Sequence, residues 1–233
     1  MVLIHGAGGH CLSWPSEIRR LAGFRIYALD LPGHGKSGGC GQQSIQAYAM
    51  KVMEWLDAVG LHQAIFIGHS MGGAIGLTLA LENPEQVNGI GLLGTGPRLR
   101  VSPALLESSS SGTTFHQAVE SVVGLSFHPG TDRSLLDQVS RRLSETRQSV
   151  FYSDFLACEG FEVTERVSQI RRPCLVICGA QDRMVPLRHS QYLAANIPGA
   201  SLDIIPDAGH MVMLEQPGRV AKSLAKFLPS VAY

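Results

Sequence analysis

Six short runs of aliphatic residues are spaced along the chain, and between them apolar residues recur at the intervals of a helix. The runs are rich in Val, Ile and Leu, which is typical of strands buried on both faces of a parallel sheet. The alternation of such runs with helical stretches predicts an α/β fold with crossover helices between parallel strands. The expected strands are Met1–Ile4, Phe24–Leu29, Ala64–Ile67, Val87–Leu93, Cys174–Cys178 and Ala200–Ile205.

Two segments have a clear helical period of apolar residues. The first follows Ser44, a candidate N-cap, and stops at Gly60, so we expect a helix that covers one face of the sheet. The second lies near the end of the sequence and predicts a closing amphipathic helix. Their apolar positions are Ile45, Tyr48, Val52, Leu56 and Val59 in the first, and Val220, Leu224 and Phe227 in the second.

The alternation of strands and helices lapses between about residues 97 and 168. This segment holds helical fragments, a serine run and a turn signal at His128-Pro129-Gly130. Because a structureless loop of that length is uncommon inside a compact domain, we expect two or more helices there. The predicted organisation is a core of residues 1–96 and 169–233 that carries a helical cap insertion of residues 97–168, packed on the core or closed over a pocket.

Composition narrows the class of protein. Apolar residues make up 45% of the 233 residues and charged residues 16%, which suits one globular core and not a disordered chain. Lys plus Arg equals Asp plus Glu, at 19 each, and the basic residues occur at most as adjacent pairs. We therefore expect no nucleic-acid partner.

Targeting and cysteine signals point to an unexported protein. No apolar run approaches the roughly 20 residues that span a bilayer, and the first residues lack the charged and apolar regions of a signal peptide. The five cysteines are widely spaced and lack the pairing of a zinc site. We expect reduced thiols, no metal, no membrane span and a cytoplasmic location.

The sharpest chemical signal is Gly68-His69-Ser70-Met71-Gly72-Gly73, which directly follows the expected strand Ala64–Ile67 and precedes an apolar helical stretch. A nucleophile on a tight strand-to-helix turn needs glycine on both sides, because a side chain there would collide with neighbouring backbone. The turn also places Ser70 near a helix N-terminus, where backbone N–H groups favour developing negative charge. An ordinary glycine-rich turn is the alternative, but the strand and helix on either side favour Ser70 as a nucleophile.

Four motifs, taken in order, resemble the α/β-hydrolase superfamily, specifically its carboxylesterase-like members with a helical cap. They cover both core segments, whereas the insertion matches only in position and helical character. The resemblance implies a mostly parallel sheet of about six strands flanked by helices, and no metal or organic cofactor. The motifs are His5-Gly6-Ala7-Gly8, the segment Asp30–Ser37, the Ser70 turn, and Gly209-His210-Met211 followed by Leu214-Glu215-Gln216-Pro217.

The resemblance also implies a catalytic triad in the order serine, acid, histidine, with the last two on loops after later strands. Asp182 follows the strand Cys174–Cys178 and His210 follows Ala200–Ile205. We expect Ser70 to be the nucleophile, His210 the general base and Asp182 the acid that orients it. Weaker candidates are Asp207, the strongest rival, then Asp30, Asp154 and Asp203 for the acid, and His62, His116, His128 and His189 for the base.

The early turn His5-Gly6-Ala7-Gly8 resembles the oxyanion loop of this family, in which the residue after His-Gly turns its N–H toward the tetrahedral intermediate. The implied oxyanion hole consists of the backbone N–H groups of Ala7 and Met71. We expect His5 to brace this loop and not to transfer protons. The segment Asp30–Ser37 is expected to be a structural turn.

These expectations together predict a serine hydrolase, a carboxylesterase that acts on a small-molecule, fairly apolar ester through an acyl-enzyme. The same triad also serves lactonases, C–C hydrolases, thioesterases, perhydrolases and acyltransferases, and the sequence does not separate these. A dehalogenase or epoxide hydrolase is disfavoured, because those enzymes resemble this fold with an aspartate nucleophile, and position 70 is serine. The alternative of another class is a non-enzymatic ligand-binding member of the fold.

Members of this family usually carry an N-terminal antiparallel hairpin before the His-Gly strand, but here Met1 opens that strand directly. We therefore expect an exposed apolar edge beside Phe24–Leu29. Exposed edges pair with other strands, so we hypothesise a homodimer through this edge or by strand exchange. A truncated or alternatively started chain is the other explanation.

Overall fold

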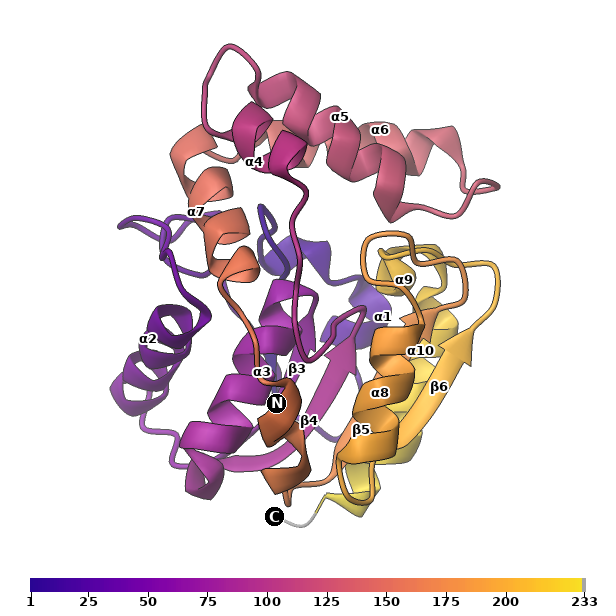
Figure 1. The fold of residues 1–233 in the computed structure, drawn as a ribbon. Helices are drawn as coiled ribbons and strands as arrows, with labels where there is room; N and C mark the ends of the chain where they lie inside the picture. The colour runs from indigo at the N-terminus through magenta and orange to yellow at the C-terminus, as the bar shows by residue number, and fades with distance from the viewer. Residues whose placement is uncertain (232–233) are drawn as a thin grey trace.

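Six strands form one sheet in the order β2-β1-β3-β4-β5-β6, and every neighbouring pair is parallel (Figure 1). The computed structural model describes residues 1–231. The predicted fold class, a mostly parallel sheet of about six strands flanked by helices, is confirmed. The strands are β1 Val2–Ile4, β2 Tyr27–Ala28, β3 Ala64–His69, β4 Val87–Leu93, β5 Cys174–Gly179 and β6 Ser201–Ile205.

The two edge strands depart from the prediction. The expected strand Phe24–Leu29 is regular only over Tyr27–Ala28, although the Leu29 N–H still donates to the Leu3 carbonyl at 3.1 Å. The prediction that all six strands are buried on both faces is wrong for β2 and β6, both of which are partly exposed. Each has a neighbouring strand on one side only, whereas the four central strands are enclosed by strands and helices.

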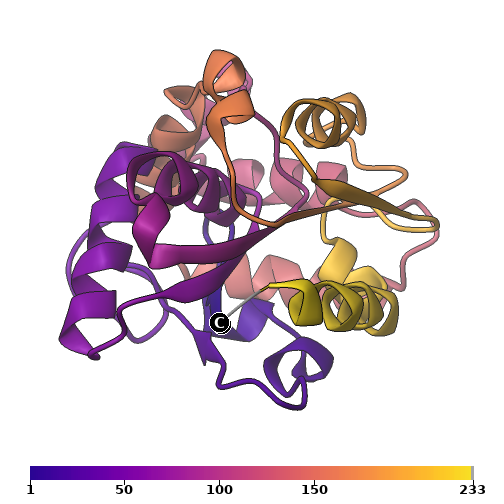
Figure 2. The ribbon, with the colours of Figure 1, turned by 90° about the horizontal axis from the view of Figure 1, so that it is seen from below.

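Helices cover both faces of the sheet (Figure 2). The helices α2 Ile45–Ala58, α3 Met71–Glu82 and α8 Arg188–Asn196 bury their apolar residues against one face, and α1 Ser16–Arg19 and α10 Pro217–Phe227 against the other. The remaining short elements are α9 Val212–Glu215 and the 3₁₀ turns η1 Cys11–Ser13, η2 Pro84–Gln86, η3 Thr164–Gln169 and η4 Leu228–Ser230.

Both helices expected from their period are present. The Ser44 hydroxyl accepts a hydrogen bond from the Ala47 N–H at 3.2 Å and so caps α2. Gly60 follows the end of this helix with φ +69°, a left-handed conformation that favours glycine. In α10, the residues Val220, Leu224 and Phe227 are buried against the sheet, as predicted.

Four helices lie between β4 and β5, and Figure 1 shows α4, α5 and α6 across the top of the molecule. They are α4 Pro103–Ser109, α5 Phe115–Ser126, α6 Arg133–Glu145 and α7 Gln148–Glu159. Their buried side chains form a separate apolar cluster against which Met211 and Leu214 of the core also pack. We call these four helices the cap and retain the 97–168 boundaries as a proposal.

The open side of β2 borders a groove whose other wall is α2. Ile26, Tyr27 and Trp55 contribute to the lining of this groove. Within residues 1–231, no helix has both the length and the apolar character needed to cross a membrane.

Candidate active site

Ser70 lies on the turn between β3 and α3 in a strained backbone conformation. Its φ of +52° and ψ of −115° are rarely adopted by a residue other than glycine. The turn is held by hydrogen bonds from the Ser70 N–H to the Leu93 carbonyl, at 2.8 Å, and from the Gly73 N–H to the Ser70 carbonyl, at 2.9 Å. Strain of this kind concentrates at functional sites, where the surrounding structure enforces it.

The glycines on either side of Ser70 allow this turn to pack. A Cβ atom at Gly68 would lie 2.1 Å from the Gly72 carbonyl oxygen, and one at Gly72 would lie 2.1 Å from the Ile4 carbonyl oxygen. Real Cβ atoms do not approach backbone this closely. A side chain at either position would therefore collide with backbone, as the sequence pattern implies.

His210 is hydrogen bonded to Asp182. The His210 Nδ1–H donates to Asp182 Oδ2 at 2.9 Å, and both side chains are buried. The other carboxylate oxygen of Asp182 accepts the N–H groups of Met184 at 2.9 Å and Val185 at 2.8 Å. With Nδ1 protonated, the neutral ring leaves Nε2 free to accept a proton.

The other acids considered from the sequence form hydrogen bonds to groups other than His210. The carboxylate of Asp30 accepts backbone N–H groups, Asp203 accepts the Ser223 hydroxyl, and Asp154 lies in a separate buried network. Within the described part of the chain, no bond links His210 to any of these, nor to Asp207.

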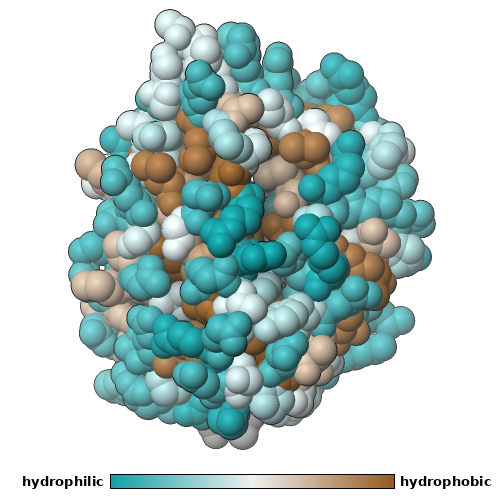
Figure 3. Space-filling view, viewed as in Figure 1, coloured by the Kyte–Doolittle hydropathy of each residue, from teal (hydrophilic) through white to brown (hydrophobic). Residues whose placement is uncertain are grey.

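Ser70 and His210 line one cavity between the sheet and the cap, although among residues 1–231 no hydrogen bond joins their side chains. Catalytic hydrogen bonds of this kind often tighten only when substrate is bound. Most of the cavity wall is apolar, and Figure 3 shows apolar side chains gathered beneath the cap helices. The apolar lining residues include Val122, Val139, Leu143, Phe155, Met184, Met211, Met213 and Leu214.

Two backbone N–H groups near Ser70 lack partners. The N–H of Met71, the first residue of α3, and that of Ala7 donate to no group in the described chain. Ala7 lines the cavity together with Ser70. Helix N-termini and such turns present N–H groups to anions, which is the role that the sequence resemblance implies for this pair.

His5 braces the loop that carries Ala7. Its Nδ1–H donates to the Gly6 carbonyl at 2.8 Å, and its Nε2 accepts the Leu31 N–H at 3.1 Å. Burial, followed by the nearby His34, lowers the pKa of His5 to about 3, so the ring is neutral. This geometry agrees with the expected structural role of His5.

His69 has a role that the sequence reasoning missed. Its Nε2–H donates to the backbone carbonyl of His210 at 3.0 Å, and the two rings lie 4.7 Å apart. Burial, and then the proximity of His210, hold the pKa of His69 well below its usual value. The residue before the nucleophile therefore positions the loop of the candidate base, and its place in the Ser70 motif was the available signal.

Glu215 ties the His210 loop to the cap. Its carboxylate accepts the N–H groups of Gly209 at 2.8 Å and His128 at 2.7 Å, and the Thr131 hydroxyl at 2.6 Å. The His210 N–H itself donates to the Ser126 carbonyl at the end of α5, at 2.7 Å. The cap therefore helps to hold the loop that carries His210.

Asp154 ties the cap to the oxyanion loop. This fully buried residue of α7 accepts the Gly8 N–H at 2.7 Å, His34 Nε2–H at 2.8 Å and the Tyr48 hydroxyl. Burial alone would lower the pKa of His34, but the hydrogen bond to Asp154 and the charge of that carboxylate raise it. Sequence reasoning weighed Asp154 only as a rival acid, because no local pattern reveals partners so distant along the chain.

One cluster brings together atoms that could ligate a metal. His10, Cys11 and Asp30 place such atoms within 4.8 Å of one another. However, both Asp30 oxygens already accept backbone N–H groups, from Cys11 at 2.7 Å and Lys36 at 2.9 Å. Burial, and then Asp30, raise the pKa of the Cys11 thiol, which disfavours the thiolate that metals bind. The cluster is better explained as a brace for the Asp30–Ser37 turn.

Known proteins resemble this chain over almost its whole length. A hydrolase of Comamonas testosteroni, named for 2-hydroxy-6-oxononadienedioate and 2-hydroxy-6-oxononatrienedioate, is 27% identical over 256 residues, covering 98% of this chain and 87% of that protein. The solved structure of a thermophilic esterase is 32% identical with a TM-score of 0.86, covering 99% and 90% of the two chains. That of a hydrolase from Pseudomonas aeruginosa PA01 is 26% identical with a TM-score of 0.88, covering 97% and 88%. The sequence profile of the alpha/beta hydrolase family matches residues 1–223, and the chain belongs to that family.

Proposed function

We propose that this hydrolase cleaves carboxylic esters with Ser70 as nucleophile, His210 as general base and Asp182 as the orienting acid. The observation that carries the proposal is the buried bond between His210 Nδ1 and Asp182 Oδ2, at 2.9 Å, beside a serine on a strained turn in the same cavity. The similarity to a thermophilic esterase at 32% identity supports an ester substrate.

The proposed reaction begins when Ser70 Oγ attacks the ester carbonyl carbon and His210 Nε2 takes the hydroxyl proton. Asp182 stabilises the resulting imidazolium, and the N–H groups of Ala7 and Met71 bind the oxyanion. The loss of one such donor typically costs about 2.7–4 kcal/mol of transition-state stabilisation. The leaving alcohol takes the proton from His210, and water then cleaves the acyl-enzyme by the same route in reverse.

Hydrolysis of a p-nitrophenyl ester series from acetate to long chains tests this proposal. We expect Ser70→Ala to lower kcat by at least about 10⁴-fold. Ser13→Ala is the matched control, because Ser13 lines the same cavity without contacting the proposed triad. Turnover that survives Ser70→Ala would refute the assignment.

Labelling with an organophosphate separates an enzyme from a ligand-binding protein of the same fold, because the reaction requires an activated serine. Mass spectrometry should locate the adduct on Ser70, and His210→Ala should abolish it. An unlabelled wild-type protein would favour the non-enzymatic alternative.

Lactonase, C–C hydrolase, thioesterase, perhydrolase and acyltransferase activities remain alternatives with the same proposed triad. The name of the Comamonas testosteroni relative gives specific weight to hydrolysis of a 2-hydroxy-6-oxo-dienedioate. Competition between such an acid and p-nitrophenyl acetate would separate the two: a larger kcat/KM for the acid would displace the esterase proposal.

The homodimer expected from the open edge of β2 stays a prediction, as does the cytoplasmic location. Light scattering at high protein concentration tests the dimer directly, and a mass of one chain would refute it.

A further inference from the structure

A groove of about 290 Å³ adjoins the candidate cavity and shares Ser70, Phe155 and Met184 with it. Its walls come from the segment that follows β4, from α7, and from the loop between β5 and α8. The groove contains neither the oxyanion loop nor His210, both of which line the cavity. Ser70 therefore stands where two spaces of different character meet.

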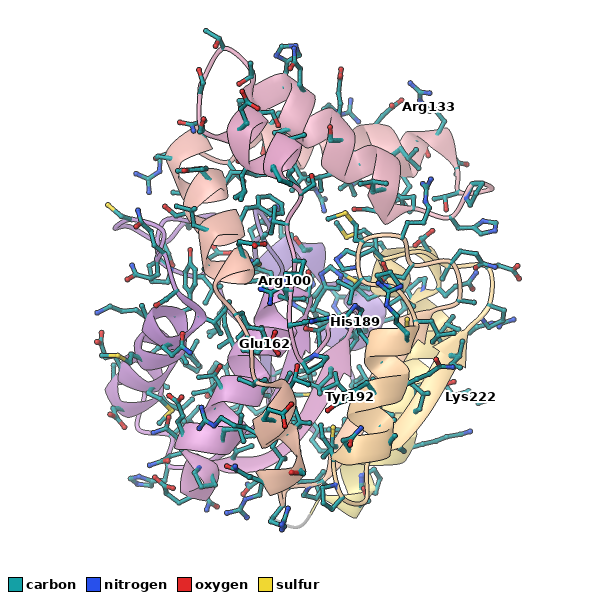
Figure 4. The ribbon with its side chains drawn as sticks, viewed as in Figure 1. Arg100, Arg133, Glu162, His189, Tyr192 and Lys222 are labelled. Atoms are coloured by element: carbon teal, nitrogen blue, oxygen red, sulfur yellow. The ribbon has the colours of Figure 1, made fainter. Side chains whose placement is uncertain are left out.

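The lining of the groove is strongly basic. It includes four arginines and one histidine, and no acidic side chain belongs to it. Figure 4 shows Arg100 and His189 near the middle of one face, and Figure 3 shows strongly hydrophilic side chains there. Because the whole chain has a net charge of zero, this concentration is local. The basic lining residues are Arg98, Arg100, Arg183, Arg188 and His189.

Most of these guanidinium groups lack an acidic partner. Arg100 pairs with Glu162 at 3.1 Å, whereas Arg183 donates only to backbone carbonyls. The side chains of Arg98 and Arg188 make no hydrogen bond or ion pair with any residue in the described range 1–231. Their charges are thus available to a ligand.

Arg98 and Arg188 line the same groove, although they come from different segments. Burial, and then the charges of Arg188 and Arg98, lower the pKa of His189, and the smaller effects of Asp182 and Glu162 oppose this shift. Like charges held together repel, and a groove lined by one sign of charge attracts ions of the other sign. The guanidinium fork matches carboxylate and phosphate geometry in particular.

We propose that this groove binds an anionic group, a carboxylate or phosphate, on the alcohol part of the ester. The cavity, at about 50 Å³, is much smaller than the groove, so it suits a short acyl group, and the alcohol part would extend from Ser70 into the groove. This inference rests on the proposed esterase function and adds to it a substrate class: short-chain acyl esters of anionic alcohols.

The test compares two acetyl esters that differ in charge, 4-acetoxybenzoate and its neutral methyl ester, and uses 4-acetoxyphenyl phosphate to separate phosphate from carboxylate. We expect the ratio of kcat/KM for the anionic ester to that for the neutral ester to fall about 3- to 10-fold in Arg98→Gln/Arg188→Gln. The matched control is Arg133→Gln/Lys222→Gln, which removes two exposed charges elsewhere on the surface (Figure 4) and should keep the ratio.

An unchanged ratio for both anionic esters in Arg98→Gln/Arg188→Gln would overturn the proposal. A charge preference confined to the acyl side would also overturn it. That result would be faster cleavage of mono-p-nitrophenyl glutarate than of p-nitrophenyl valerate, with no difference in kcat/KM between 4-acetoxybenzoate and its methyl ester. Calorimetry on the Ser70→Ala background tests the groove without hydrolysis. There, 4-acetoxybenzoate should bind about 3- to 10-fold more weakly when Arg98 and Arg188 are replaced, and equal binding refutes the groove even if the ester reaction itself is absent.

Discussion

Replacing Asp154 by asparagine is expected to lower the free energy of unfolding by about 3–5 kcal/mol, the usual cost of breaking a buried charge-assisted pair. In the folded protein this carboxylate accepts the Gly8 N–H at 2.7 Å, His34 Nε2–H at 2.8 Å and the Tyr48 hydroxyl. Asparagine has the same shape but only one acceptor oxygen, and its NH₂ group must face a donor. At least one buried donor is then unsatisfied, at about 1–3 kcal/mol, and the charge that stabilises protonated His34 is lost.

Urea denaturation followed by circular dichroism measures this loss, and the melting temperature should fall by about 6–20 °C, at 2–4 °C per kcal/mol for a chain of this size. The matched control is Asp203→Asn, since Asp203 is half-buried and bonded to a single hydroxyl, that of Ser223. We expect the control to change stability by less than about 1 kcal/mol. A loss below about 1 kcal/mol in Asp154→Asn would refute the inference that this carboxylate joins cap and oxyanion loop.

Three further results follow from the structure. Gly72→Ala should yield little folded protein, because its Cβ would lie 2.1 Å from a backbone oxygen. The control Gly76→Ala, whose Cβ would have its nearest neighbour at 3.8 Å, should raise the free energy of unfolding by up to about 1 kcal/mol. Equal yields of the two variants would contradict this. His5 and His69 have lowered pKa values, to about 3 for His5, so the unfolded chain binds protons that the folded chain does not. Stability should therefore fall below pH 6.5 by about 1.4 kcal/mol per pH unit for each ring, and a flat urea midpoint between pH 7 and pH 5 would count against it. Glu215→Gln should lower the free energy of unfolding by about 1.5–3 kcal/mol and reduce the proposed esterase activity, as measured by thermal melts and p-nitrophenyl acetate turnover. Unaltered activity would exclude a role of Glu215 in holding the candidate base.

The sequence predicted the sheet well because the central strands are apolar at nearly every position, and such runs have few alternatives to burial. Ser70, Asp182 and His210 could be nominated because each stands at a strand-to-loop junction in a fixed chain order. The hydrogen bonds of Asp154 could not be predicted from the sequence, because its partners lie 106 to 146 residues away and only the tertiary fold brings them together. The exposed β6 was missed for a related reason: which strand lies at an edge depends on strand order, which local hydropathy does not encode.

The attachment of the His210 loop to the cap has a consequence for how the molecule can open. If the cap lifted from the sheet, the bonds from the His210 N–H to the Ser126 carbonyl and from the His128 N–H to Glu215 would break. The bonds from His210 to Asp182 and His69 lie within the core and would remain. Opening would therefore loosen the candidate base without parting it from its acid.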